Sequence, residues 1–294
     1  MMRGLAELAM RGPKQAIILA MVFAGIPMLF WLSAAIVSLV ILRRGISHGL
    51  NVLMWALLPG IAWAAMGQFS IISGLAVTAC LAVVLRQTVS WCRTLMTIVP
   101  LGALIVLALT YWNPPQLVVM TEMVQSLLKP MLEQSGALSV KSTDIQVLIH
   151  SGVIGILAWF SLAFCLLGLL LARAWQAMLF NPGGFGYEFR RIRLPVAAMM
   201  VLLVFMLASL TLPSTILSLF PVVTLPLFIA GLGLVHGLVE LRNRGKIWLV
   251  IFYMVLALFT QLAYPVIVLT ACLDSLFDFR KRISNRMNQD SSGV

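Results

Sequence analysis

Residues 145–172 read IQVLIHSGVIGILAWFSLAFCLLGLLLA, a run of 28 residues without a charged side chain. About 20 consecutive apolar residues are enough to cross a bilayer as a helix. The sequence therefore predicts an all-α, polytopic transmembrane helical bundle with about 8–10 apolar segments, and it excludes a soluble enzyme. Charge-free runs of at least 27 residues also occupy 15–42, 45–85, 94–121, 194–239 and 247–273.

The composition agrees with this prediction over the whole chain of 294 residues. Hydrophobic residues make up 62% of it, charged residues make up 10%, and the mean hydropathy is +1.05. Globular domains are nearer half apolar and a quarter charged. We therefore expect a single integral membrane domain over 1–294, with an outside loop at 112–146, an inside loop at 173–194 and a cytoplasmic tail at 274–294.

The net charge of +11 comes from 20 lysines and arginines against 9 acidic residues. Basic residues between membrane spans are the ordinary signal for cytoplasmic loops. We therefore expect a multi-pass protein of the bacterial cytoplasmic (inner) membrane, with the lipid bilayer as a partner and no nucleic acid.

The basic residues distinguish two ways of counting the spans. Eight spans divide the lysines and arginines almost equally, with 9 on one side and 11 on the other. Ten segments place 18 on one side and only Lys129 and Lys141 on the other. The ten-segment count needs hairpins that turn at Gly25-Ile26-Pro27 and near Tyr264-Pro265, where proline and glycine disfavour helix. We prefer this count, with both termini cytoplasmic and further turns at Gly67-Gln68 and Leu212-Pro213-Ser214.

The outside loop 112–146 predicts an amphipathic helix on the membrane surface or over the bundle. Trp112-Asn113-Pro114-Pro115 indicates a helix stop before it, and Ser142-Thr143-Asp144 indicates a cap for the next span. The loop is either a solvated connector or a lid over an outward-facing cavity. Its apolar face is expected to carry Leu117, Met120, Val124, Leu127, Leu128 and Met131, with Thr121 and Glu122 on the polar face.

The inside loop 173–194 contains Pro182-Gly183-Gly184, which predicts a defined turn. No Lys-Ser or Lys-Thr follows at the spacing of a phosphate loop, so nucleotide binding is not favoured. The aromatic and arginine residues after the turn suit contact with anionic lipid headgroups, or docking of a cytoplasmic partner. The candidate docking residues are Gly183, Gly184, Phe185, Arg190 and Arg191.

Catalytic and metal-binding patterns are scarce, so we expect no enzymatic activity, no cofactor and no metal site. The four cysteines lack paired spacing, and no two histidines have the spacing of metal ligands. An ionisable group inside a membrane segment is a functional candidate by default. His236 is the best such case, although pairing with Glu240 would give it a structural role.

Ala16, Ala20 and Ala24 recur every four residues in the first apolar segment. Small residues in one row let another helix approach closely. The row is either packed inside this chain or docks a separate membrane subunit.

Three further motifs carry a resemblance. These are Asn181-Pro182-Gly183-Gly184-Phe185 followed by Glu188-Phe189 and Arg193-Leu194, the ending Leu273-Asp274-Ser275-x-Phe277-Asp278-Phe279-Arg280, and Arg43-Arg44-Gly45. Over most of its length the chain resembles the YybS-like family of uncharacterised bacterial membrane proteins. That family is distantly similar to the S-components of energy-coupling-factor transporters, small helical bundles that capture a micronutrient from outside.

The resemblance implies an S-component-like fold and an alanine row that docks a transmembrane coupling subunit. This chain is longer, and no vitamin-binding residue of the S-components maps onto it. We expect an integral inner-membrane protein that binds or helps transport a small molecule. The alternatives are a scaffold or assembly factor acting through the inside loop and, third, a lipid enzyme. The expected pocket lies among the outside turns, with candidate contacts Gln68, Trp112, Asn113, Glu122 and His150.

Overall fold

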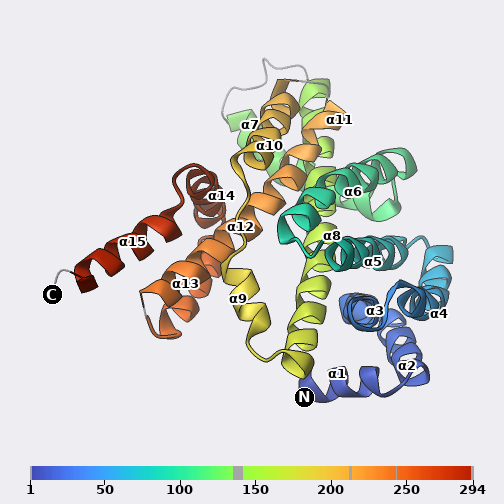
Figure 1. Cartoon of the computed structure of the whole chain (residues 1–294). Helices are drawn as coiled ribbons and strands as arrows, with labels where there is room; N and C mark the ends of the chain where they lie inside the picture. The colour runs from blue at the N-terminus through green and yellow to red at the C-terminus, as the bar shows by residue number, and fades with distance from the viewer. Residues whose placement is uncertain (1, 135–141, 212–213, 243, 293–294) are drawn as a thin grey trace. The chain divides into compact units, whose positions relative to one another are not determined.

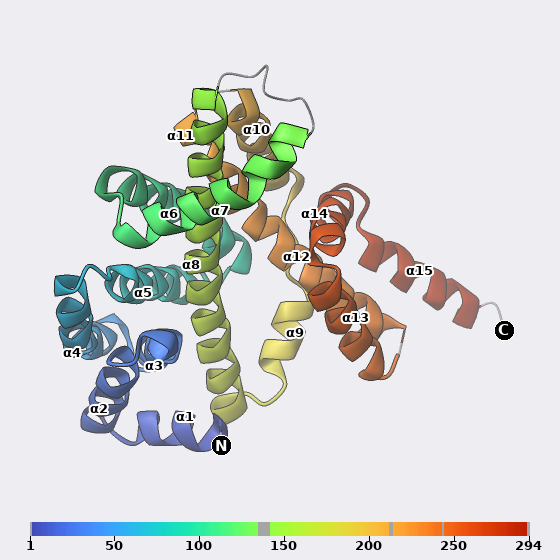
Figure 2. The same cartoon turned by 180° about the vertical axis from the view of Figure 1, so that it is seen from behind.

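The computed structural model describes residues 2–134, 142–211, 214–242 and 244–292, which form helices and no strand (Figures 1 and 2). Seven of the described helices are long and apolar enough to cross a membrane. Three shorter apolar helices accompany them, at Pro13–Ala24, Val196–Leu210 and Ile247–Leu258. The protein is thus a multi-pass membrane protein, and the predicted all-α helical bundle is confirmed.

The chain forms two compact units, each made of two stretches of sequence. Unit 1 comprises Met1–Pro182 and Phe205–Val222, and unit 2 comprises Gly183–Val204 and Val223–Val294. Helices α10 (Val196–Thr211) and α12 (Leu219–Leu241) therefore contribute residues to both units. The other elements of unit 1 are α1 (Met2–Arg11), α2 (Pro13–Ala24), the short 3₁₀ helix η1 (Pro27–Leu29), α3 (Phe30–Arg44), α4 (Ile46–Ala65), α5 (Ser70–Thr88), α6 (Trp91–Trp112), α7 (Pro115–Gln134), α8 (Ser142–Phe180) and α11 (Ser214–Leu217). Those of unit 2 are α9 (Gly184–Arg190), α13 (Ile247–Leu258), α14 (Thr260–Phe277) and α15 (Phe279–Ser292).

Helix α3 forms the core of unit 1. Every residue from Ser33 to Leu42 is buried, because α2, α4, α5 and α8 pack around the helix. Glycines make this approach possible. A Cβ atom on Gly49 would lie 2.1 Å from Ile41 Cγ1, and one on Gly168 would lie 2.9 Å from the carbonyl oxygen of Trp31.

The predicted hairpin in run 15–42 is confirmed. Helix α2 ends at Ala24, directly before Gly25, and η1 leads into α3. The two helices pack on each other, and the Ser33 hydroxyl donates a hydrogen bond of 2.7 Å to the carbonyl of Ala20.

The second predicted hairpin exists, but its break was placed wrongly. The chain leaves the helix at Phe259, six residues before Pro265, and Pro265 lies inside α14. The ring of a proline crowds the carbonyl of the residue four positions earlier. The disruption therefore falls on the N-terminal side of Pro265, towards Gln261 and the start of α14.

Helix α8 is longer than the charge-free run 145–172 from which a span was predicted. It runs on to Phe180, so the first part of the predicted inside loop is helical. Trp175 is 1% exposed, and Arg173 donates a hydrogen bond of 2.6 Å to the side chain of Gln176. No helix breaker occurs before Pro182, so the helix extends through these packed residues. The predicted cap at 142–144 lies outside the described side chains.

Helix α7 confirms the helix predicted within 112–146, but its buried face differs from the predicted one. Leu117 and Thr121 are buried, whereas Met120 and Leu127 are exposed. Pro130 lies inside the helix, and the residues that follow at 135–141 are outside the described chain. In a membrane protein, apolar side chains that avoid water can face lipid as well as protein, so the spacing alone did not identify the packed face.

In unit 2, the ends of α12 and α14 lie at the same end of the unit. Near the start of α12, the Thr224 and Tyr264 hydroxyls are 2.6 Å apart. Near its end, a Cβ atom on Gly237 would lie 3.4 Å from Nε of Arg280, just beyond α14. The two helices thus run in the same direction, and α13 connects them in the sequence.

Candidate functional site

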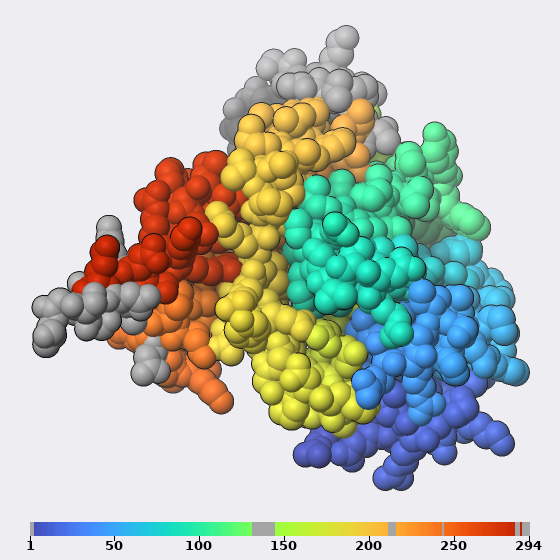
Figure 3. All heavy atoms as spheres, in the orientation of Figure 1, coloured from blue at the N-terminus to red at the C-terminus, as the bar shows by residue number. Residues whose placement is uncertain are grey.

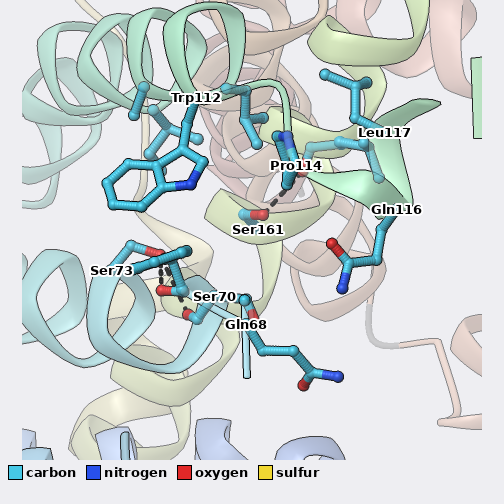
Figure 4. Close-up of a pocket in the computed structure, with 14 residues that line it drawn as sticks. Gln68, Ser70, Ser73, Trp112, Pro114, Gln116, Leu117 and Ser161 are labelled. Carbon is cyan, nitrogen blue, oxygen red and sulfur yellow. Dashed lines mark hydrogen bonds between the residues drawn. The ribbon is translucent and has the colours of Figure 1, made fainter. Parts of the chain in front are cut away.

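A pocket of about 290 Å³ lies in unit 1, where two helix connections meet α8 (Figure 4). Trp112 and Pro114 lie on one side of it, Ser70 and Ser73 lie on the other, and Ser161 lies between them. Ligand pockets in proteins usually measure about 300–1,000 Å³. This pocket is at the lower end of that range, so it suits a small molecule. The lining residues are Gly67, Gln68, Phe69, Ser70, Ser73, Ile105, Ala108, Leu109, Trp112, Pro114, Gln116, Leu117, Leu157 and Ser161.

The first wall is the connection between α4 and α5. Gly67 has φ +84°, a left-handed conformation that favours glycine. The backbone N–H groups of Gly67 and Gln68 donate hydrogen bonds of 2.9 and 3.0 Å to the carbonyls of Ala64 and Trp63. This tight turn ends α4 and presents Gln68 and Phe69 at the pocket.

The second wall is the connection between α6 and α7. Asn113 ends α6 in the left-handed conformation, with φ +41°. Pro114 then accepts a hydrogen bond of 2.8 Å from the N–H of Leu117, which begins α7. The connection places Trp112 and Gln116 at the pocket.

Phe69 and Trp112 join the two walls. Their ring centroids are 4.1 Å apart, and the ring planes are tilted by 48°. Aromatic pairs of this kind contribute about 0.5–1.5 kcal/mol beyond their buried area. The pair therefore holds the α4–α5 and α6–α7 connections together at the rim of the pocket.

The polar groups of the pocket differ in their availability. The hydroxyls of Ser73 and Ser161 already donate to carbonyls of their own helices, at 3.0 Å to Phe69 and 2.9 Å to Leu157. The side-chain amides of Gln68 and Gln116 and the indole N–H of Trp112 have no hydrogen-bond partner among the described residues. These three groups are therefore available to a ligand.

None of the lining residues is charged. A charged ligand would leave water for a largely apolar cavity without a counter-charge, which is strongly unfavourable. An uncharged molecule could use the amides as both donors and acceptors. The lining thus favours a small neutral ligand that has both apolar and polar groups.

The opposite end of unit 1 is basic. Arg86 donates hydrogen bonds of 3.0 and 2.6 Å to the carbonyls of Ile41 and Leu42, and Arg44 donates to the carbonyl of Met10. These contacts gather the ends of α1, α3 and α5. In the space-filling view, the blue N-terminal helices and the teal α5–α6 junction form one continuous surface (Figure 3). Because α4 and α6 each run from this end to a pocket connection, the pocket lies at the far end of unit 1.

Two of the five predicted contacts, Gln68 and Trp112, line the pocket. Asn113 lies between the lining residues Trp112 and Pro114 but does not itself line the pocket. Glu122 is exposed on α7 and does not line the pocket. His150 lies with Nδ1 3.4 Å from the Thr121 hydroxyl, so it links α8 to α7.

Sequence reasoning missed Phe69, Gln116 and Ser161. Phe69 and Gln116 directly follow the predicted turns, which is the only signal that the sequence offered for them. Ser161 lies inside a charge-free run and carries no such signal, because only the folded chain brings α8 against the two connections.

Ala16, Ala20 and Ala24 are at most 1% exposed. Helices α3 and α4 pack against α2, which carries the row. The row is thus covered by the chain's own helices. This corresponds to the first alternative, in which the row packs inside this chain.

The predicted docking residues in unit 2 have several roles. Gly183 has φ +86° and caps α9, which begins at Gly184, as expected of the turn. Arg190 forms an ion pair with Glu240, and Phe185 packs on Phe189. Arg191 is exposed, with its guanidinium 3.8 Å from the centroid of the Tyr187 ring. Arg190 and Phe185 therefore contribute to the packing of unit 2.

His236 bonds a neighbour other than the predicted one. Its Nε2 atom is 2.8 Å from the Tyr253 hydroxyl, and its ring meets the edge of Phe189. Glu240 pairs with Arg190 instead. These contacts give His236 a packing role between α12, α13 and α9.

The two motifs quoted at 188–194 and 273–280 meet in unit 2. Arg193 donates a hydrogen bond of 2.8 Å to the Asp278 carboxylate, and Arg280 lies 3.5 Å from that of Asp274. Burial lowers the pKa of the Arg280 guanidinium, while the carboxylates of Asp274 and Asp278 oppose that shift. Arg280 also donates to the carbonyls of Arg190 and Ile192. The motifs thus form an ionic cluster that ties the segment after α9 to the end of α14.

Within the described part of the chain, no three histidine, cysteine or acidic side chains are placed to hold a metal ion. Comparison with models of protein families, with curated proteins and with solved structures gave no match.

Proposed function

We propose that this membrane protein binds a small, uncharged molecule in the pocket of unit 1 and delivers it for transport. The observation that supports the proposal most directly is the lining of the pocket. It combines two unpaired amides and an indole N–H with apolar side chains and no charge. We assign no catalytic role to the chain.

We propose that the basic end of unit 1 is cytoplasmic and that the pocket opens on the outside. The positive-inside rule supports this orientation, because Arg43, Arg44 and Arg86 lie at the ends of apolar helices. Arg44 reaches the carbonyl of Met10, so the N-terminal helix α1 shares that end. The membrane in this proposal is the bacterial cytoplasmic membrane.

Movement of the ligand across the membrane would need a second protein. Within the sequence no phosphate-binding loop is recognised, and the pocket has no carboxylate to couple ion flow. A transmembrane coupling subunit is the partner that the resemblance to the YybS-like family and to S-components implies. Since Ala16, Ala20 and Ala24 are covered, we place its docking surface elsewhere on unit 1.

The test is native mass spectrometry of the full chain, extracted from its own membranes in mild detergent. Ala108→Phe would fill the pocket, and Leu107→Phe adds a ring to the same helix outside the lining. We expect a bound small molecule in the unchanged protein and in Leu107→Phe, and none in Ala108→Phe. An unchanged protein without a ligand, or ligand retained in Ala108→Phe, would refute the proposal.

The alternative function is a scaffold that acts through the inside loop. One observation favours it, namely that Tyr187 on the short helix α9 is 54% exposed. A soluble protein that co-purifies with the chain, is lost in Tyr187→Ala and comes without any small molecule would support the scaffold instead.

A further inference from the structure

Six basic side chains of unit 2 are exposed and form no ion pair among the described residues. Three other arginines of this unit, Arg190, Arg193 and Arg280, are paired with Glu240, Asp278 and Asp274. Unit 2 thus contains arginines whose charge is balanced by an acidic partner and a second set of basic residues without such a partner among the described residues. The six exposed residues are Arg191, Arg242, Arg244, Lys246, Lys281 and Arg282.

Hydrogen bonds and an ion pair bring the segments that carry these six residues to one end of unit 2. Arg280, at the start of α15, donates hydrogen bonds of 2.8 Å to the carbonyls of Arg190 and Ile192. Arg190 in turn pairs with Glu240 near the end of α12, two residues before Arg242. The end of α9, the α12–α13 connection and the start of α15 therefore meet. We call this the basic end of unit 2.

Three of the exposed arginines lie over aromatic rings at this end. The distance from the guanidinium carbon to the ring centroid is 3.8 Å for Arg191 over Tyr187, 5.3 Å for Arg244 over Trp248 and 5.2 Å for Arg282 over Phe277. A ring restrains the planar guanidinium without neutralising it. The N–H groups then remain available, and a guanidinium binds phosphate through two parallel hydrogen bonds.

The depth of these basic residues in the membrane follows from the helices next to them in the chain. Helices α12 and α14 are long and apolar enough to span the bilayer, and the basic residues directly follow their ends. Tyrosine and tryptophan beside the arginines are typical of the interface between lipid tails and headgroups. The charges are therefore placed where phosphodiester groups lie.

We infer that the basic end of unit 2 binds the headgroups of anionic phospholipids, with Arg191, Arg244 and Arg282 contacting the phosphates. The surface holds the ends of α12 and α14 in the cytoplasmic leaflet, where anionic lipid is present. This inference does not depend on the pocket of unit 1 or on what that pocket binds.

The experiment measures lipid binding to the full chain in detergent by native mass spectrometry. Phosphatidylglycerol and phosphatidylcholine with the same acyl chains are titrated separately. The variant combines Arg191→Gln, Arg244→Gln and Arg282→Gln, which all lie on the exposed surface. The control removes three exposed charges from unit 1, through Arg11→Gln, Lys14→Gln and Arg93→Gln.

We expect the unchanged chain to prefer phosphatidylglycerol, and the unit 2 variant to lose about tenfold or more of that preference. The unit 1 control should lose less than about threefold, because its charges are not held over rings. A fourth protein with Tyr187→Leu, Trp248→Leu and Phe277→Leu keeps every charge and should also bind phosphatidylglycerol more weakly.

The inference would be overturned if the unit 2 variant and the unit 1 control lost the preference for phosphatidylglycerol to the same extent. An unchanged chain that does not distinguish the two lipids would also overturn it. An acidic protein that co-purifies with the chain and is lost only in the unit 2 variant, while the lipid preference stays, would assign the surface to a protein partner and also refute the inference. Equal thermal unfolding temperatures of all four proteins ensure that each comparison concerns folded chains.

Discussion

Phe69 and Trp112 come from different helix connections of unit 1, yet their ring centroids lie 4.1 Å apart. This pair fixes the distance between the two walls of the pocket. The backbone segments that carry Gln68 and Gln116 are therefore held at a set separation.

Replacing Trp112 by alanine should reduce ligand occupancy of the purified chain by about tenfold, because a stacking surface and the aromatic pair are both lost. Trp55→Ala is the matched control, since Trp55 is also exposed in unit 1 but does not line the pocket. Occupancy is measured by native mass spectrometry. A similar fall in both variants would mean that the loss comes from the protein as a whole and would contradict a role for Trp112 in binding.

The proposed orientation predicts opposite labelling at the two ends of α5. Met66 precedes this helix at the pocket end, Val89 follows it at the basic end, and both are well exposed. In a chain whose native cysteines are replaced, a membrane-impermeant maleimide should label Met66→Cys in intact cells. Val89→Cys should react only after permeabilisation. The reverse pattern would place the pocket on the cytoplasmic side.

Gly168 should be essential for the packing of α8 on α3. A Cβ atom there would lie 2.9 Å from the carbonyl oxygen of Trp31, so Gly168→Ala should destabilise the protein by about 1–3 kcal/mol. On the same helix, a Cβ atom on Gly152 has nothing within 4 Å. Gly152→Ala should therefore stabilise the protein by up to about 1 kcal/mol through its helix propensity. Thermal unfolding in detergent measures both changes, and equal effects would show that α8 does not pack on α3 as described.

The Asp274 carboxylate should contribute strongly to the stability of unit 2. Its side chain is 3% exposed, accepts a hydrogen bond of 3.0 Å from the N–H of Phe279 and pairs with Arg280. Asp274→Asn leaves the Arg280 guanidinium without this counter-charge, which should cost about 3–5 kcal/mol. Glu7→Gln, which breaks the exposed Arg3–Glu7 pair, should cost less than about 1 kcal/mol. Denaturant unfolding followed by the tryptophans distinguishes the two, and a small effect at Asp274 would contradict the structural role of the cluster.

The apolar helices could be predicted because charge-free runs of this length have few alternatives in a bilayer. Their packed faces could not, as α7 illustrates. Leu117 and Leu127 are both apolar and both belong to the predicted face, but only Leu117 contacts the bundle. Hydropathy records the avoidance of water, which is the same for a side chain facing lipid and one facing protein.

The pocket was predictable only where a local signal marked it. Gln68 follows a turn glycine, and Trp112 precedes a helix stop, so both could be identified. The Phe69–Trp112 contact and the position of Ser161 depend on which helices become neighbours. In the same way, nothing local to Arg193 indicates that Asp278, 85 residues later, accepts its hydrogen bond.

The division of the chain into units has a consequence for how the protein can be taken apart. Unit 1 needs residues 205–222, since a Cβ atom on Gly102 would lie 2.3 Å from Val222 and one on Gly155 would lie 2.6 Å from the carbonyl oxygen of Ser218. A fragment that stops at Pro182 lacks these residues, and a fragment that begins at Gly183 contains a piece of unit 1 that has lost its neighbours. No single cut in the chain separates the units, so neither unit can be produced as one contiguous fragment. The segments of the two units alternate along the chain, an order that an end-to-end fusion of two independent proteins would not give.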